Sequence, residues 1–483
     1  MSSLFQAICS SKNKFPLKEA IIYREEDKYK KINFRNLYNY INSLSDYLKE
    51  YQGKTIAIIG NNKLEYAVSL LSVLCHIGNA FLIDKELSKE DILEVFKQAS
   101  PDLIILDDEI NVSFRRYKTI YFSEVSNVMR NGKKYKYDKT FSGNLILHTS
   151  GTTGKPKCIS LSEKNYFTAI PELNNKWNVT SDMSCLLIIP LYHIYALTSF
   201  FHGLYAGFLN ILEWDYRKID DVLRETKPAL FMGVPLMYNK IKDKALNESK
   251  KKIKIGILIS KLLLIFKIDI RKKVFKQIHE YFGGNYIFGC SAGSLLSFET
   301  NKFFNDIGLP LYNVYGMTET SGPIAINYKN NNRYKSVGKI LDINKIKIVN
   351  KNENNIGNIY VKGKNVFDGY INDKKRPYML DGYFDTGDIG YVKDGFLYVI
   401  GRSKNILIGP NGKNISPEEI KRKILKNKDI YDCNIIMENY KLTAVINTNL
   451  NHDEANRYIE KINKKLPNYK KIAKVKITHK NIK

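Results

Sequence analysis

The sequence predicts an α/β protein in which helices cover both faces of a mainly parallel β-sheet. Short apolar runs alternate with amphipathic helical patterns over much of the chain, and strands buried on both faces have this near-continuous apolar composition. No sequence repeat of roughly 20 to 50 residues is present, which argues against a solenoid or a propeller. The chain has 483 residues, 44% of them hydrophobic, so it is long enough for a sizeable core and for more than one domain.

The expected elements follow in order from this alternation. The apolar runs at 54–60 and 103–106 predict buried strands, and the patterns at 63–76 and 91–98 predict helices. Strand patterns resume in four further segments, at 185–190, 229–234, 286–289 and 311–315. From residue 335 to residue 400 the pattern changes to short strands separated by glycine turns, which predicts a small β-subdomain.

The last part of the chain is expected to form a separate small domain. After Gly401 the sequence predicts a short strand and then a helix that begins near Ser416, where Ser-Pro-Glu-Glu combines several helix-start residues. Mixed strand and helix patterns continue from there, with a strand expected at 470–478. We place the main boundary between Arg402 and Ser403, which gives domains at 1–402 and 403–483.

The chain is strongly basic, with 76 Lys and Arg against 49 Asp and Glu and a formal net charge of +27. An anionic partner such as a nucleotide, a nucleic acid or an acidic membrane would suit this charge. The lysines are spread over every segment, however, and no RNA-recognition aromatic motif or zinc-finger spacing accompanies them. We therefore interpret the charge as a general bias of composition and expect no nucleic-acid partner.

Cysteine spacing and the N-terminus predict a cytoplasmic protein. The six cysteines are far apart without a CxxC pair, and the seven histidines lack metal-binding spacing, so no structural zinc is expected. The N-terminus lacks the apolar core of a secretory signal. The most apolar stretch, 253–268, is interrupted by lysines and is too charged to span a bilayer. We interpret it as a core or surface helix, with a weak peripheral membrane contact as the alternative.

An apolar strand pattern at 144–148 runs directly into a loop of glycines, hydroxyls and lysines. Glycines allow positive φ and close backbone approach, successive N–H groups can form an anion-binding nest, and a hydroxyl can bind magnesium. A Walker A loop needs GxxxxGK followed by Ser or Thr. Here two residues separate Gly151 from Gly154 and Pro156 follows Lys155, so we predict a polyphosphate loop of another kind. Its residues are Thr149, Ser150, Gly151, Thr152, Thr153, Gly154, Lys155, Pro156 and Lys157.

This loop resembles the glycine-rich phosphate loop of the adenylate-forming, or AMP-binding, superfamily. That superfamily includes acyl-CoA synthetases, peptide-synthetase adenylation domains and firefly-type luciferases. Further motifs of the superfamily follow in the same order, and the resemblance extends over residues 54–473. They are PLYH at 190–193, GCSAG at 289–293, NVYGMTET at 313–320, YFDTGD at 383–388, GRSK at 401–404 and GPNGKNISPEE at 409–419. Each motif alone is weak, whereas the shared order is specific.

The resemblance implies a role for each matching residue. The implied catalytic residues are His193 beside the acyl site, Thr318, Glu319 and the hinge residue Lys404. Tyr315 offers a ring for the adenine and Thr318 a hydroxyl for the α-phosphate. Glu319 offers a hard oxygen ligand for Mg²⁺, and Thr149 is the second implied metal-binding residue. The implied nucleotide-binding set is Thr149, Ser150, Gly151, Thr152, Thr153, Gly154, Lys155, Ala292, Gly293, Tyr315, Gly316, Thr318, Asp388 and Arg402.

The resemblance also sets the expected fold and reaction. It implies a large N-terminal domain of two α/β sheet-and-helix subdomains plus a β-subdomain, followed by a small mobile α+β C-terminal domain. The implied reaction uses ATP and Mg²⁺ to convert a carboxylic acid to acyl-AMP, whose acyl group passes to CoA or to a phosphopantetheine carrier protein. Segments 271–275 and 282–284 resemble the long-chain fatty acyl-CoA synthetase branch. Residues 194–201 carry no charge where peptide-synthetase domains place an aspartate, so a fatty acid is the expected substrate.

One catalytic element of the superfamily has no match in this sequence. Relatives carry a catalytic lysine in a loop that reads like SGK, a short distance after an LPxY segment. Here LPNY occupies 466–469, but neither SGK nor TGK follows it. We expect a slower adenylation step, because loss of one charge-stabilising donor typically costs about 10²–10³ in rate. Two alternatives stay open: an acyl- or aryl-AMP ligase that loads a carrier protein, and a non-catalytic nucleotide-binding relative.

Overall fold

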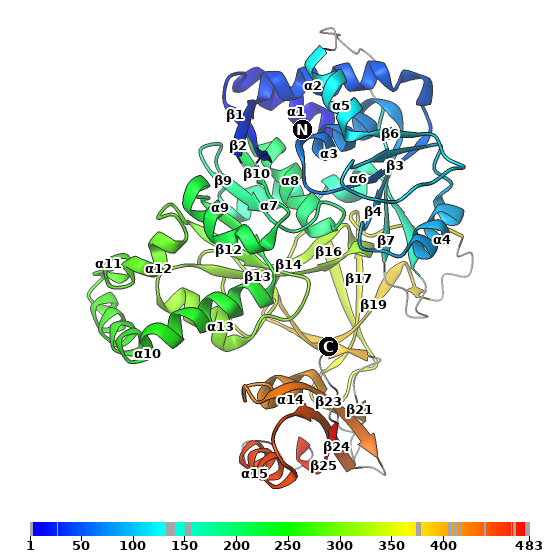
Figure 1. Cartoon of the computed structure of the whole chain (residues 1–483). Coiled ribbons are helices and arrows are strands. Elements are labelled where there is room, and N and C mark those ends of the chain that lie inside the picture. The colour runs from blue at the N-terminus through cyan, green and yellow to red at the C-terminus, as the bar shows by residue number, and fades with distance from the viewer. Residues whose placement is uncertain are drawn as a thin grey trace. The chain divides into compact units, whose positions relative to one another are not determined.

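The computed structural model divides the chain into two compact units (Figure 1). Unit 1 comprises Met1–Ile346, Val361–Phe384 and Asp394–Leu397, and unit 2 comprises Lys347–Tyr360, Asp385–Lys393 and Tyr398–Lys483. The structure describes residues 3–26, 28–131, 141–149, 156–372, 378–403, 407–408, 414–415, 417–438, 441–464, 466 and 470–478. The domain boundary expected after Arg402 stays a prediction, since unit 2 also takes up two segments that precede it.

The first sheet of unit 1 has the strand order β6-β5-β3-β4-β7-β8. All neighbouring strands are parallel except β7 and β8, which form an antiparallel pair. Strands β3, β4 and β5 are buried along nearly their whole length, as expected for strands covered on both faces. The strands are β3 (Thr55–Ile59), β4 (Asn79–Ile83), β5 (Leu103–Leu106), β6 (Thr119–Tyr121), β7 (Leu145–Thr149) and β8 (Lys157–Leu161). The helices between them are α3 (Leu64–Ser72), η2 (Val73–Ile77), α4 (Lys89–Ala99) and α5 (Phe122–Asn131).

The second sheet of unit 1 includes the strand order β15-β14-β13-β12-β11-β9-β10-β1-β2. Neighbouring strands are parallel from β1 through β10, β9, β11 and β12 to β13. The pairs β1–β2, β13–β14 and β14–β15 are antiparallel. The strands are β1 (Glu19–Glu25), β2 (Lys28–Asn33), β9 (Ser184–Leu187), β10 (Leu209–Leu212), β11 (Leu230–Gly233), β12 (Phe288–Ser291), β13 (Leu311–Met317), β14 (Gly322–Ile326) and β15 (Gly338–Ile340).

Helices surround this second sheet and connect its strands (Figure 1). The α-helices are α1 (Leu4–Lys14), α2 (Phe34–Tyr47), α6 (Glu163–Phe167), α7 (Ile170–Trp177), α8 (Ile194–Ala206), α9 (Ile219–Thr226), α10 (Pro235–Ile265), α11 (Arg271–Val274), α12 (Lys276–Tyr281) and α13 (Phe298–Asp306). Short 3₁₀ turns lie at η1 (Lys49–Tyr51), η3 (Tyr216–Lys218) and η4 (Thr318–Thr320).

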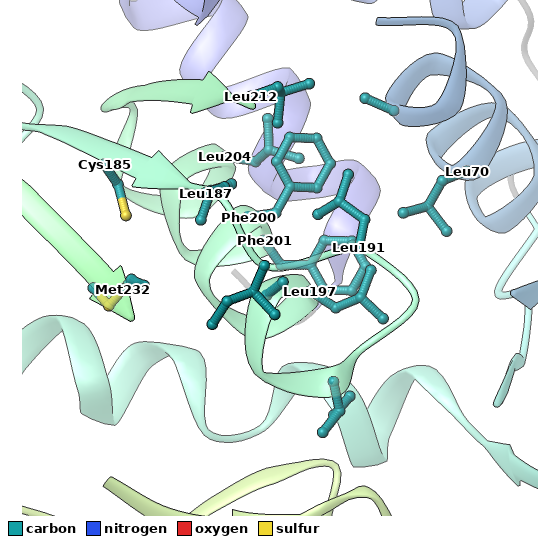
Figure 2. Close-up of a cluster of buried hydrophobic side chains, with 14 of the residues drawn as sticks. Leu70, Cys185, Leu187, Leu191, Leu197, Phe200, Phe201, Leu204, Leu212 and Met232 are labelled. Atoms are coloured by element: carbon teal, nitrogen blue, oxygen red, sulfur yellow. The ribbon is translucent and has the colours of Figure 1, made fainter. Parts of the chain in front are cut away.

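Helix α8 lies within the main hydrophobic core of unit 1 (Figure 2). Its side chains are apolar around nearly the whole circumference, which is the pattern of a buried helix rather than of an amphipathic one. Leu197, Phe200 and Phe201 are fully buried, and they pack with Leu187 of β9 and with Leu191. The uncharged stretch 194–201 therefore has a packing role in addition to any role in substrate choice.

Unit 2 is centred on the three-stranded sheet β23-β24-β25. The apolar sides of its two helices supply Ile420, Ile424 and Ile459 to a core that also holds Ile446 of the sheet. The elements are β21 (Leu407–Ile408), β22 (Asn414–Ile415), α14 (Pro417–Ile424), β23 (Ile430–Glu438), β24 (Lys441–Thr448), α15 (His452–Asn463) and β25 (Ile472–Thr478). Strands β16 (Asn344–Val349), β17 (Gly357–Gly363), β19 (Tyr383–Lys393) and β20 (Phe396–Arg402) each contribute residues to both units, and β18 (Met379–Leu380) belongs to unit 1.

The predicted α/β class is confirmed, and several elements differ in their bounds from the expected ranges. The strand expected at 185–190, for example, is observed at Ser184–Leu187. The helix expected at 63–76 is α-helical only to Ser72 and continues as the π-helical turn η2, which ends at Gly78, where the Lys54 backbone leaves no room for a side chain. The strand expected at 286–289 is shifted to Phe288–Ser291, the residues that pair with β11 and β13. Among the described residues, no helix is long and apolar enough to cross a bilayer.

Candidate functional site

An antiparallel hairpin holds the two ends of the predicted phosphate loop. β7 ends at Thr149, β8 begins at Lys157, and these two residues are paired in the ladder. Gln98 of α4 fixes the second strand, since its Nε2 donates to the Pro156 carbonyl (3.0 Å) and its Oε1 accepts from the Cys158 N–H (3.0 Å). The predicted residues Ser150, Gly151, Thr152, Thr153, Gly154 and Lys155 lie outside the described residues. Half-buried Thr149 is therefore the described residue that marks the mouth of this loop.

The predicted residue His193 lies with a second histidine, His148 of β7, around Asp84. His148 Nε2 accepts a hydrogen bond from the Asp84 N–H (3.0 Å), which requires a neutral ring with its proton on Nδ1. His193 is the N-cap residue of α8, with the Tyr192 ring centroid 4.5 Å from its own. Desolvation by the surrounding protein lowers the pKa of both histidines, although the Asp84 carboxylate opposes the shift. Both rings are therefore neutral near pH 7 and can hydrogen-bond an approaching carboxylate.

Sequence reasoning missed Asp84 and His148 as members of this group. Asp84 directly follows the buried strand β4, and His148 is the penultimate residue of β7. β4 and β7 are parallel neighbours, so their carboxyl ends meet at the edge where open α/β sheets bind ligands. A polar residue at the end of each apolar run was the signal that could have found both.

The YGMTE segment places Glu319 in a short turn at the end of β13. β13 ends at Met317 and the 3₁₀ turn η4 begins at Thr318, so Thr318 and Glu319 both project from the carboxyl end of a parallel strand. The Glu319 carbonyl accepts from the Phe367 N–H (2.9 Å), and its Oε1 accepts from the Tyr370 hydroxyl (2.8 Å). These two bonds fix both the backbone and the carboxylate of Glu319.

Tyr370 joins the YGMTE segment to the strand that follows the phosphate loop. The Nζ of Lys157 lies 5.1 Å from the centroid of the Tyr370 ring, and Tyr370 forms a backbone bridge with Ile159 of β8. The same tyrosine donates its hydroxyl to Glu319. The structure therefore brings two motifs that lie far apart in sequence to one edge of unit 1. Tyr370 belongs to none of the predicted motifs, and no local pattern marked it.

The small-residue turn at Ala292 and Gly293 lies beside the YGMTE strand. Both residues directly follow β12, which is the parallel neighbour of β13. Gly293 has φ +83°, a conformation that favours glycine, and Ala292 is buried. Gly316 approaches the Gly322 carbonyl so closely that no side chain would fit. Gly293 is exposed, and Gly316 is half-buried next to half-buried Tyr315.

In unit 2 the predicted ribose residues Asp388 and Arg402 are bound to each other. Arg402 Nε lies 3.0 Å from Asp388 Oδ1, and an Arg402 terminal nitrogen donates to the Thr386 carbonyl (2.8 Å). Asp388 is almost fully buried, and its N–H donates to the Thr386 hydroxyl (3.1 Å). Gly387, with φ +69°, makes the turn that aligns them. Predicted Lys404 lies outside the described residues.

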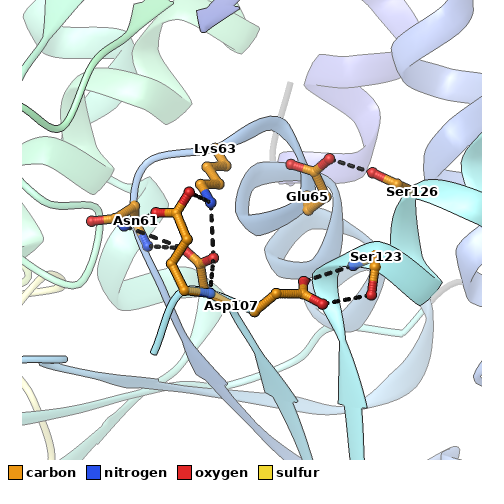
Figure 3. A network of polar contacts seen from close by, with 8 residues as sticks. Asn61, Lys63, Glu65, Asp107, Ser123 and Ser126 are labelled. Atoms are coloured by element: carbon orange, nitrogen blue, oxygen red, sulfur yellow. Dashed lines mark hydrogen bonds and ion pairs between the residues drawn. The ribbon is translucent and has the colours of Figure 1, made fainter. Parts of the chain in front are cut away.

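A second polar cluster lies just after the carboxyl ends of the neighbouring strands β3 and β5 (Figure 3). Buried Asp107 lies 2.9 Å from Lys63 Nζ and accepts from the Asn61 N–H (3.1 Å), and Lys63 also pairs with Glu109 (2.8 Å). Burial opposes the charge of Lys63, but the bonds to Glu109 and Asp107 outweigh it and raise its pKa. The charged groups of the cluster pair with one another beside a cavity of about 550 Å³, so the cluster serves mainly to fix the loops after both strands.

Comparison with known families gives one match that covers most of the chain. Residues 9–371 match the family described as AMP-binding enzyme. This segment contains the hairpin around the phosphate loop, His193, the small-residue turn, Glu319 and Tyr370. Asp388, Arg402 and Lys404 lie beyond it.

Curated relatives and solved structures agree with this match. The chain is 28% identical over 423 residues to the long-chain-fatty-acid–CoA ligase ACSBG2 of Mus musculus, covering 75% of this chain and 63% of that protein. It is 29% identical over 308 residues to the long-chain-fatty-acid–CoA ligase FadD15 of Mycobacterium bovis, covering 56% of this chain and 48% of that protein. The chain thus spans less than two thirds of the length of these relatives.

Two solved structures share the fold at low sequence identity. The unliganded o-succinylbenzoate coenzyme A synthetase of Bacillus subtilis has a TM-score of 0.78 at 19% identity, with 98% of this chain and 99% of that chain covered. ATP-bound MatB of Rhodopseudomonas palustris has a TM-score of 0.79 at 21% identity, with 99% and 95% covered. At this identity the likeness establishes the fold, and the chemistry has to come from the site residues.

Proposed function

Because the chain belongs to the family of AMP-binding enzymes, we propose that it activates a carboxylic acid with ATP and Mg²⁺ and transfers the acyl group to CoA. The observation that carries the proposal is the series of contacts from Lys157 through Tyr370 to Glu319. These contacts join the strand after the phosphate loop to the YGMTE turn. A single ATP molecule needs both segments together, one for its β- and γ-phosphates and the other for its α-phosphate.

The proposed chemistry solves a leaving-group problem. A carboxylate resists nucleophilic attack because its leaving group would be an oxide ion. In the first step a carboxylate oxygen attacks the α-phosphorus of ATP, a new O–P bond forms, and pyrophosphate leaves. In the second step the sulfur of CoA attacks the carbonyl carbon, AMP leaves, and a thioester remains. The protein contributes position and charge neutralisation to both steps.

Each site residue has one task in this proposal. Thr149 and the loop at 150–155 hold the outer phosphates, and Thr318 donates its hydroxyl to the α-phosphate. Tyr315 stacks on the adenine over the turn formed by Ala292 and Gly293. Asp388 and Arg402 bind the ribose, with Lys404 as the hinge residue. His193 borders the acid, where its neutral ring can hydrogen-bond a carboxylate oxygen without a second full charge.

Glu319 and Thr149 suit a magnesium ion. Mg²⁺ prefers oxygen ligands and usually takes one or two of them from the protein, with phosphates and water supplying the rest. Glu319 offers a carboxylate whose orientation is fixed by Tyr370, and Thr149 offers a hydroxyl at the mouth of the loop. A Mg²⁺ ion bound there would neutralise phosphate charge. Tyr370 contributes by holding the carboxylate in place before ATP arrives.

We propose a fatty acid, or another apolar acid, as the substrate. The curated relatives named long-chain-fatty-acid–CoA ligases support this choice. The uncharged character of α8 also supports it, since this helix, which follows His193, offers no charged side chain to a substrate amino group. The names of the same relatives support CoA as the acceptor. The test below distinguishes CoA from a carrier protein.

The proposal is tested by the products that the full-length chain forms from ATP. The chain is incubated with ATP, Mg²⁺ and a panel of fatty, aromatic and amino acids, and AMP and pyrophosphate are measured with and without CoA. We expect pyrophosphate release that depends on an apolar acid and turnover that rises with CoA. Glu319→Gln should lower kcat by about 10²–10³. Glu90→Gln, an exposed change in the first turn of α4, is the matched control and should leave kcat unchanged.

Two results would overturn the proposal. One is release of AMP that does not depend on any acid, and the other is equal kcat for the wild type and Glu319→Gln. Acylation of a carrier protein at a rate that CoA does not match would keep the adenylation step and replace the acceptor.

A further inference from the structure

The C-terminal half of α10 presents an apolar face to solvent (Figure 1 shows the position of α10). Its side chains Ile255, Leu258, Ile259, Leu262 and Ile265 are between 47% and 74% exposed. At about 100° per residue these five positions fall on one face roughly 120° wide. Phe266 and Ile268, which directly follow the helix, are also exposed and extend the apolar face.

The opposite face of α10 is packed, so this exposure is fixed by the fold. Ile253 and Ser260 are buried, and Gly256 lies directly against Val274 and Phe275 at the end of α11. Lys261 Nζ pairs with Asp306 of α13 at 2.9 Å. The helix is therefore held on one side by α11 and α13, and it cannot bury its outer face by rotating without losing these contacts.

Basic side chains border the apolar face. Segment 250–276 has a single acidic residue, Asp269, and that carboxylate is bound bidentately by Arg271 (2.9 and 2.6 Å). Two of its exposed lysines have protein carboxylates as partners, Lys261 with Asp306 and Lys276 with Glu280. The other exposed lysines are Lys250, Lys251, Lys252, Lys254, Lys267, Lys272 and Lys273. An amphipathic helix with apolar residues on one face and lysines beside them is the pattern of a helix that lies in the interface of an anionic membrane.

We propose that α10 and the segment after it, residues 250–276, dock this protein on the surface of an anionic lipid bilayer. The five apolar side chains enter the boundary between headgroups and acyl chains, and the lysines pair with lipid phosphates. Burial of the apolar face distinguishes this partner from a nucleic acid, which offers phosphates but no apolar layer. Charge distinguishes it from a second copy of the chain, since two such faces would bring like charges together.

Membrane docking goes beyond the proposed ligase reaction and does not depend on it. Delivery of an apolar acid from the bilayer to the site rests on that reaction, whereas vesicle binding does not. The binding assay therefore contains no ATP, acid or CoA. A chain without ligase activity would still bind vesicles if the docking proposal is right, and an active ligase would not bind them if it is wrong.

The test is flotation of the full-length chain with vesicles of two compositions. One set is phosphatidylcholine alone, and the other contains roughly one third phosphatidylglycerol. We expect binding to the anionic vesicles, little binding to the neutral ones, and release as salt is raised. The triple variant Leu258→Gln, Leu262→Gln, Ile265→Gln should lower the partition coefficient at least about tenfold. The triple variant Lys251→Gln, Lys254→Gln, Lys267→Gln should weaken anionic binding by a similar factor and remove its salt dependence.

Matched controls carry the same substitutions elsewhere on the surface. Leu17→Gln changes an apolar side chain that is 70% exposed, and Lys97→Gln changes an exposed lysine of α4. Both should bind vesicles as the wild type does. Thermal unfolding of all variants shows that they fold, since every changed residue is exposed.

Three outcomes overturn the proposal. The wild type could fail to float with anionic vesicles, or the α10 variants could float as well as the controls. The third is a concentration-dependent dimer that the Leu258→Gln triple variant abolishes in the absence of lipid, which would assign the face to a second copy.

Discussion

Glu319 is the residue whose surroundings define the candidate site most closely. Its carboxylate is bound by the Tyr370 hydroxyl at 2.8 Å, and its carbonyl by the Phe367 N–H at 2.9 Å. Phe367, Tyr370 and Tyr378 pack against one another, with ring centroids 5.0 to 5.8 Å apart. This aromatic cluster presents one rigid carboxylate at the end of β13, which is what a preorganised metal ligand requires.

Removal of the Tyr370 hydroxyl tests whether that preorganisation matters. Tyr370→Phe keeps the ring and its packing but loses the bond to Glu319 Oε1, and a hydrogen bond to a charged group is worth about 1.5–3 kcal/mol. We expect at least about a tenfold rise in the Mg²⁺ concentration needed for half-maximal pyrophosphate release. Tyr121→Phe, which removes the hydroxyl of a 42% exposed tyrosine on β6, is the matched control. An unchanged Mg²⁺ dependence for Tyr370→Phe would contradict the role given to this bond.

His202 is a buried histidine that the mechanism does not use, and it should make the fold sensitive to acid. Its Nε2 lies 3.1 Å from Asn174 Oδ1, and burial lowers its pKa from 6.5 to about 3. Between pH 6.5 and about 3 the unfolded chain therefore binds a proton that the folded chain refuses. The contribution of the neutral His202 ring to the free energy of unfolding is complete above pH 6.5 and is lost as pH falls. The loss is about 2 kcal/mol between pH 7 and pH 5.

The His202 effect can be measured by urea unfolding at pH 7 and pH 5. His202→Gln keeps a donor for Asn174 and cannot titrate in this range, so its loss of stability on acidification should be smaller than that of the wild type by about 2 kcal/mol. His452→Gln, which changes a histidine at the start of α15 in unit 2, should behave as the wild type. Equal pH dependence in all three chains would refute the assignment.

At the scale of elements, the loops after β3 and β5 depend on one buried carboxylate. Asp107 is fully buried and binds the Asn61 N–H and the Lys63 ammonium (Figure 3). Asp107→Ala would leave Lys63 with Glu109 alone and the Asn61 N–H without its acceptor. We expect a loss of about 3–5 kcal/mol in the free energy of unfolding of unit 1.

Glu109→Gln is the matched control for that loss. Glu109 pairs with the same lysine, but its side chain is 61% exposed, so its removal should cost less than about 1 kcal/mol. Chemical denaturation of both variants measures the change in the free energy of unfolding. Comparable losses for Asp107→Ala and Glu109→Gln would show that burial of the carboxylate does not set its importance.

Local patterns predicted the elements well and the long-range contacts of the site poorly. The run LIIL at 103–106 predicted β5 at its observed bounds, because a buried strand between two polar residues admits few alternatives. Glu319 was predicted from its motif, whereas Tyr370 was not, since their bond spans 51 positions and arises from the pairing of Tyr370 with β8. His148 and Asp84 were not predicted for the same reason, because strand order rather than local sequence makes them neighbours.

At the scale of the whole molecule, the net charge of +27 has two components. Lysines in most segments reflect the general composition, as the sequence predicted. Segment 250–276 differs because its lysines border an exposed apolar face and because the segment itself contains a single carboxylate, Asp269, which Arg271 binds. Composition alone could not reveal this difference, since the side chains of 253–268 divide between a packed and an exposed face only in the folded chain.

The central claim is that the chain forms an acyl-AMP at the edge of unit 1 that holds Glu319 and Thr149. The most direct measurement is mass-spectrometric detection of acyl-AMP after the full-length chain is mixed with ATP, Mg²⁺ and a long-chain fatty acid without CoA. We expect acyl-AMP that disappears on addition of CoA, and about 10²–10³-fold slower formation by Glu319→Gln. Release of ADP and phosphate in place of AMP and pyrophosphate, or acyl-AMP formed equally fast by Glu319→Gln, would contradict it.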